Sequence, residues 1–156
     1  MRRVAAVLIG LTAVAGCGGP GSSVVRATGP EYEVATAALG GLGTVLVDGQ
    51  GYTLYLYVPD DHSSRSTCTG ICIANWPPLL LPSGVALPLA GRGVHASLLG
   101  TTTRSDGGTQ VTYDGWPLYL WANDTGPGQH SGQGLYNSGG LWFVVSPDGE
   151  PIRSSP

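Results

Sequence analysis

Hydrophobic and polar residues follow one pattern that the chain contains twice, at Leu54–Asp60 and at Leu118–Asp124. Both copies have the form Tyr-x-aromatic-x-x-Asp. Side chains along a strand point to opposite faces in turn, so the leucines share one face and the aromatic rings share the other. With both faces apolar, the pattern predicts two central strands that are covered on both sides. The motif residues are Tyr55, Tyr57 and Asp60 in the first copy and Tyr119, Trp121 and Asp124 in the second.

A longer internal repeat surrounds this motif. An Asp-Gly turn signal precedes it in both copies, and Trp76 of the first copy returns 66 residues later as Trp142. Residues 45–81 match residues 111–146 in this way. Two tandem copies in a chain of 156 residues predict two halves that pack into one compact domain with a pseudo-twofold arrangement.

Glycine- and proline-rich turns divide the rest of the chain into short elements. Residues 94–104 and 110–113 flank the turn Ser-Asp-Gly-Gly and predict an antiparallel hairpin, and residues 141–146 predict a final strand. The segment Cys68–Trp76 favours a short helix, which Ser66 or Thr67 can cap and which the two following prolines end. The predicted fold class is mainly β, with short antiparallel strands and one short helix.

The first residues have the features of an export signal. Arg2 and Arg3 precede an apolar run over residues 4–14, which is too short to span a bilayer because that requires ~20 residues. The run ends at Val-Ala-Gly-Cys17, which resembles the lipobox whose cysteine is acylated in bacterial lipoproteins. The alternative is an ordinary secreted protein with a free Cys17.

These features predict four regions along the chain. The signal peptide is expected over residues 1–16, and the lipidated Cys17 begins a flexible tether over residues 17–43. The two-copy domain is expected over residues 44–150, and residues 151–156 form a C-terminal tail.

The net charge of the chain without its signal peptide argues against some classes of binding partner. Without the signal peptide the chain keeps five arginines and no lysine against ten carboxylates, a formal charge of −5. An acidic domain without a basic patch argues against nucleic-acid binding. It argues equally against electrostatic binding to lipid headgroups, so contact with the membrane is expected through the acyl chains alone.

Two cysteines remain after the anchor, Cys68 and Cys72. In an exported protein such a pair usually forms a disulfide, and a spacing of four residues is compatible with a bond across one helical turn. A redox pair is one alternative. Another is a copper site with His62, since soft thiolates suit Cu(I). A thioredoxin-type redox motif has two residues between its cysteines where this chain has three, whereas the CxxxC spacing does occur in copper-delivery proteins. We favour the disulfide and expect no cofactor.

The motif aspartates, Asp60 and Asp124, have two interpretations. They could be paired carboxylates for acid–base chemistry, or they could accept hydrogen bonds from turn N–H groups or pair with a buried arginine. Arg104, which follows a threonine-rich strand, is the candidate partner. We favour the structural interpretation and expect at least one of the two carboxylates to be partly buried. The aromatic rings of the motif are likewise expected to belong to the core.

The order of these elements resembles that of bacterial lipoproteins with the "secreted repeat of unknown function", which carry a Yx(FWY)xxD motif. The resemblance covers about residues 44–150 and rests on both motif copies and on CTGICIANWPPLL, QVTYDGWPLYLW and GGLWFVVSPDG. It implies an exported protein of undetermined activity, usually lipid-anchored, and it supplies no catalytic residue. We therefore expect a non-enzymatic binding or structural domain on the bacterial cell membrane, facing outside the cytoplasm, with an unknown ligand or protein partner. The alternatives are a redox or copper-binding protein that uses Cys68 and Cys72, and a hydrolase-like enzyme that uses Asp60 and Asp124.

Overall fold

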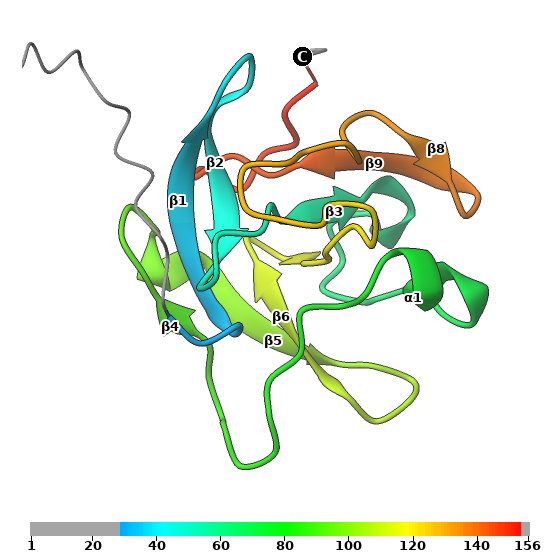
Figure 1. Cartoon of the computed structure of the whole chain (residues 1–156). Helices are drawn as coiled ribbons and strands as arrows, with labels where there is room; N and C mark the ends of the chain where they lie inside the picture. The colour runs from blue at the N-terminus through cyan, green and yellow to red at the C-terminus, as the bar shows by residue number, and fades with distance from the viewer. Residues whose placement is uncertain (1–28, 154–156) are drawn as a thin grey trace, which may run out of the picture.

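The computed structural model describes residues 29–153, and their fold is mainly β, as predicted (Figure 1). Short strands form three small sheets, and one short α-helix lies at the side of the molecule. In chain order the elements are β1 (Glu33–Leu39), β2 (Gly43–Asp48), β3 (Tyr55–Tyr57), the 3₁₀ helix η1 (Val58–Asp60), α1 (Ile71–Asn75), β4 (Leu89–Ala90), the 3₁₀ helix η2 (Ala96–Leu98), β5 (Leu99–Thr103), β6 (Thr109–Tyr113), β7 (Trp116–Pro117), β8 (Tyr136–Asn137) and β9 (Gly140–Val144).

Each sheet has three strands, in the orders β2-β1-β4, β3-β9-β8 and β5-β6-β7. A hairpin opens each copy of the repeat: β1 pairs antiparallel with β2 in the first, and β5 pairs antiparallel with β6 in the second. The second hairpin is the one predicted around the Ser-Asp-Gly-Gly turn, and that prediction is confirmed. Strand β4 pairs with β1 in the parallel sense.

The last strand of each copy pairs with the other copy. Strand β9 ends the second copy and pairs with β3 of the first, where Val144 lies opposite Tyr55. The segment after α1 ends the first copy and pairs with β6 of the second through a bridge between Leu80 and Gln110. The two halves are therefore intertwined, because the closing segment of each copy pairs with a strand of the other.

The motif strands separate two hydrophobic clusters, as their alternating pattern predicts. Leu54, Leu56 and Leu118 belong to one cluster, whereas Tyr55 and Tyr119 belong to the other. Both tyrosines have no exposed surface. The second copy of the motif forms no regular strand, because Tyr119 makes only isolated bridges, with Tyr55 and with a proline after α1.

The expected domain boundaries are too narrow at both ends. Strand β1 lies inside the stretch expected to be a tether, and it pairs with β2 along its length, with Val34 and Leu39 buried. Alanine and threonine at its other positions give too weak an alternation to be recognised. At the other end, Pro151 bridges to Val145, and the Ile152 side chain packs on the core. The predicted signal peptide and Cys17 lie outside the described residues.

The short helix forms where it was predicted but begins later. Its N-cap is Gly70, at φ +57°, which glycine adopts without strain. Ser66 and Thr67 do not cap it, because the helix begins only at Ile71 and both hydroxyls are bonded elsewhere, that of Thr67 to Asp60 and that of Ser66 to Tyr119. The helix ends at Trp76, directly before the two prolines, as expected.

The intertwined strands predict that neither half folds alone. The chain can be cut in the exposed loop between Ser83 and Gly84, where insertions and nicks are tolerated best. Fragments 29–83 and 84–153 should each lack the near-ultraviolet circular dichroism of packed aromatic rings, and an equimolar mixture should regain it. A native-like spectrum from either fragment by itself would contradict the intertwined arrangement.

Candidate functional site

The motif residues of the two copies are joined by crossed hydrogen bonds. The Tyr55 hydroxyl donates to Asp124 Oδ2 at 2.5 Å, and the Tyr119 hydroxyl donates to Asp60 Oδ2 at 2.7 Å. The same two tyrosines also exchange backbone N–H···O bonds, both of 2.9 Å. Tyr55 and Tyr119 therefore each donate to the aspartate of the other copy, and the pseudo-twofold axis passes between these two tyrosines.

The second oxygen of each carboxylate accepts hydrogen bonds from a loop of its own copy. Asp60 Oδ1 accepts from the backbone N–H and the hydroxyl of Thr67, at 2.7 and 2.6 Å. Asp124 Oδ1 accepts from the backbone N–H and the hydroxyl of Ser131, at 2.9 and 2.7 Å. Both aspartates are buried, and each accepts three hydrogen bonds. This is the arrangement of a structural carboxylate that satisfies turn N–H groups.

Burial is the largest influence on the pKa values of the Asp60 carboxyl and of the Tyr55 and Tyr119 hydroxyls. Burial raises the pKa of the Asp60 carboxyl, while hydrogen bonds from Thr67 and Tyr119 act in the opposite direction. The pKa of the Tyr55 hydroxyl is raised far above its usual value of 10.0, first by burial and then by the Asp124 carboxylate. Burial and the nearby Asp60 raise the pKa of Tyr119 in the same way. Both phenols consequently stay neutral and remain hydrogen-bond donors throughout the physiological pH range.

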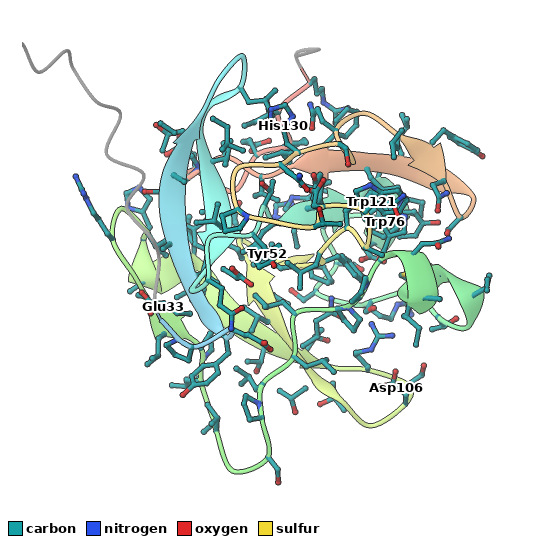
Figure 2. The ribbon with its side chains drawn as sticks, in the orientation of Figure 1. Glu33, Tyr52, Trp76, Asp106, Trp121 and His130 are labelled. Carbon is teal, nitrogen blue, oxygen red and sulfur yellow. A yellow bond between two sulfur atoms is a disulfide. The ribbon has the colours of Figure 1, made fainter. Side chains whose placement is uncertain are left out.

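Four aromatic rings stack in a row beside the crossed pairs, in the order Tyr57, Trp142, Trp76 and Trp121. The central two are the equivalent tryptophans of the two copies, and their rings are parallel within 1° at a centroid distance of 3.9 Å. Figure 2 shows Trp76 and Trp121 next to each other above α1. Asn137 satisfies both central indoles: its side-chain oxygen accepts from Trp76 Nε1, and its backbone oxygen accepts from Trp142 Nε1, both at 3.0 Å. Of the four rings, only that of Trp121 is half-buried rather than buried, so the row is essentially core.

The two cysteines form a disulfide, with their Cα atoms 5.3 Å apart. Both are buried in the same cluster as the stacked rings. His62 is placed elsewhere, since its imidazole stacks on Trp116 and interacts with Asp114. No group of three or more histidine, cysteine, aspartate or glutamate side chains that could hold a metal ion occurs within residues 29–153.

Arg104 is buried, but it does not pair with either motif aspartate. Its ion pair is with Asp106, two residues further on, at 3.1 Å. Its Nη1 donates to the hydroxyl of Ser66 and to Gln110, and its Nη2 donates to the backbone oxygen of Cys68. The guanidinium reaches Asp60 only indirectly, because the Ser66 hydroxyl also bonds to the Tyr119 hydroxyl.

Thr67 and Ser131 are partners of the carboxylates that the sequence patterns described above do not predict. A signal for them exists, because each hydroxyl residue lies seven positions after the aspartate of its copy. The crossed pairing of the tyrosines has no comparable local signal.

The model of a protein family described as a secreted repeat of unknown function matches residues 36–80 and 100–146. The two matched stretches correspond to the two copies, and each includes residues of the opening hairpin that the predicted repeats left out. No curated protein and no solved structure matches the chain. Among the described residues, no helix has the length and apolar character needed to cross a membrane.

The crossed hydrogen bonds can be tested by removing one donor. Tyr55→Phe should lower the free energy of unfolding by about 2 kcal/mol, because it leaves a buried oxygen of Asp124 without that donor. Tyr136→Phe is the matched control, since that ring is 74% exposed. Combining Tyr55→Phe with Asp124→Asn should cost less than the two single losses added together. Urea unfolding measures all four variants, and strict additivity would show that the two groups do not interact.

Alkaline pH should destabilise the fold. In the unfolded chain both motif tyrosines lose their protons near pH 10, whereas in the folded state the raised pKa values of Tyr55 and Tyr119 keep them protonated. The unfolded state therefore gains stability as pH rises above about 10, by roughly 1.4 kcal/mol per pH unit for each tyrosine. Urea unfolding between about pH 9.5 and 11.5 measures this slope. The slope should be smaller in Tyr55→Phe, and an equal slope would contradict the assignment.

Proposed function

Because the chain belongs to the family of the secreted repeat of unknown function, we propose that it is a lipid-anchored protein of the bacterial cell membrane with its two-copy domain outside the cytoplasm. Family membership indicates a secreted protein, and the lipid anchor and the role are our additions. We assign the domain a non-enzymatic, binding or structural role. The observation that supports this most strongly is that the candidate catalytic groups are engaged by other residues of the same domain.

A hydrolase-like role for the aspartates has little support. A general acid or base must come within hydrogen-bond reach of the proton that it transfers on a substrate. Asp60 has no exposed surface and Asp124 is 6% exposed, and each already accepts three hydrogen bonds from the chain. These contacts connect the two copies to each other, which is sufficient reason for both aspartates to be present.

A redox or copper-binding role has little support for a related reason. Metal binding and thiol exchange both use the thiolate, whereas the sulfurs of Cys68 and Cys72 are bonded to each other inside the core. His62, the third proposed ligand, is engaged by Trp116 and Asp114. A copper site would therefore require reduction of the disulfide and rearrangement of the loop that carries His62.

The position of Cys17 suits an anchor. Eleven residues, 18–28, lie between it and Gly29, where the described domain begins. A chain of that length spans at most roughly 40 Å when fully extended. An acylated Cys17 would then hold the domain within about one domain diameter of the membrane surface.

The anchor is tested by fractionating cells that express the full chain. Cys17→Ser removes the thiol that is acylated, so this protein should leave the membrane fraction after a carbonate wash. The double variant Cys68→Ser and Cys72→Ser is the control and should stay in the membrane fraction, since it keeps Cys17. Retention of Cys17→Ser in the washed membranes would disprove the anchor.

A further inference from the structure

An open pocket of about 310 Å³ lies at the Trp121 end of the aromatic stack. Its lining includes two aromatic rings and three carboxylates, among them the motif residue Asp124, and no arginine, lysine or histidine. The lining residues that matter here are Glu31, Asp48, Tyr52, Pro77, Trp121 and Ala122. We refer to it as the Tyr52 pocket.

Two carboxylates of the Tyr52 pocket, those of Asp48 and Glu31, accept hydrogen bonds from neighbouring residues. Asp48 is only 2% exposed, and its Oδ1 accepts from the backbone N–H groups of Gln50 and Tyr52 at 2.9 and 2.8 Å. Glu31 is exposed and accepts a long hydrogen bond from the Gln50 side chain. An acidic site between aromatic rings favours a cation, which the ring faces and the carboxylates both attract.

The equivalent region of the other half is filled by larger side chains. Within the repeat, Pro77 corresponds to Phe143, and Ala122 corresponds to Val58. Phe143 and Val58 pack in one cluster together with Trp116, which corresponds to Tyr52. The Tyr52 pocket is therefore open because the residues that line it, from both copies, are smaller than their equivalents.

The filled half also has two planar nitrogen-bearing side chains, of His62 and Arg153, that lie on aromatic rings. The imidazole of His62 lies flat on Trp116, with ring centroids 5.0 Å apart and planes within 8°. Its Nε2 is 3.5 Å from Asp114 Oδ2, and Asp114 is the equivalent of Asp48. The guanidinium of Arg153 lies over the Phe143 ring, 5.1 Å from its centroid. In the other copy, glycine stands at position 126, the equivalent of His62, and offers no such side chain.

We propose that the Tyr52 pocket binds a planar organic cation, a guanidinium group such as an arginine side chain of a ligand, in the manner that His62 occupies the equivalent place in the other half. A guanidinium suits this place because it stacks on an aromatic face while its N–H groups point at carboxylates within the same plane. Trp121 and Tyr52 supply the ring faces, and Glu31 and Asp48 supply the negative charge. This inference rests on the proposed binding role and not on the lipid anchor.

The test compares two probes of equal shape on the purified protein, from whichever cell fraction contains it. N-acetyl-arginine methylamide carries the guanidinium, and N-acetyl-citrulline methylamide replaces it with a neutral urea group. Binding is measured by calorimetry and by the fluorescence of the tryptophans. The arginine probe should bind about tenfold more tightly than the citrulline probe, as expected when a charge-assisted contact is lost.

Substitutions of pocket-lining residues test whether the arginine probe binds in the Tyr52 pocket. Glu31→Gln should weaken the arginine probe about fivefold, whereas Glu150→Gln, the same change on an exposed glutamate outside the pocket lining, should have no effect. Tyr52→Leu should weaken the same probe while urea unfolding shows that the protein remains folded. Equal weakening by the two glutamate variants would overturn the pocket assignment, because it would indicate only a general effect of charge.

The outcomes also separate this inference from the proposed function. If neither probe binds, or if both bind equally, the cation site is overturned. Membrane fractionation of Cys17→Ser decides the anchor independently of either result. Equal binding of both probes would still agree with a binding role of the domain, although it would exclude recognition of the charge.

Discussion

Two crossed hydrogen bonds between tyrosine and aspartate hold this fold together. A buried carboxylate is costly unless hydrogen-bond donors surround it, and in each copy one of the three donors comes from the other copy. Asp124 is satisfied only when Tyr55 is in place, and Asp60 only when Tyr119 is in place. Neither half can adopt its loop without the other, so the hydrogen bonds make the pairing of the two halves a condition of folding.

The aromatic core follows from the same residues. The ring of Tyr55 meets Trp76 edge-on, and the ring of Tyr119 meets Trp142 in the same way, at centroid distances of 5.4 and 5.1 Å. The tyrosines that donate to the carboxylates thus also fix the two tryptophans that stack on the axis. Such edge contacts add to the stabilisation from burial. Asn137 in turn accepts hydrogen bonds from the indole N–H groups of both tryptophans.

Local patterns predicted local features of this structure. The alternation in the motif predicts which side chains face each hydrophobic cluster, although only the first copy forms a regular strand, and the repeat predicts two halves. Both predictions depend on neighbouring residues or on direct comparison of the copies. The crossed bonds link residues 69 and 59 positions apart, and no periodicity specifies which distant tyrosine meets which aspartate. Strand β1 was missed because small residues alternate weakly. Arg104 was assigned to a motif aspartate, whereas the turn beside it places Asp106 closer.

The crossed bonds also constrain where the two copies can differ. Residues on the axis must fit their equivalents, so tyrosine faces tyrosine in the central backbone bridge and tryptophan faces tryptophan in the stack. Residues away from the axis meet no equivalent, and there the copies differ. His62 stacks on Trp116 in one copy, whereas its equivalent in the other, Gly126, has no side chain to stack on Tyr52, which lines the open pocket. A duplicated domain of this kind keeps two equal halves for stability, so a difference in recognition arises only at the periphery. The uncovered half is consequently the part of the surface where an external group can take the place that an internal side chain holds in its twin.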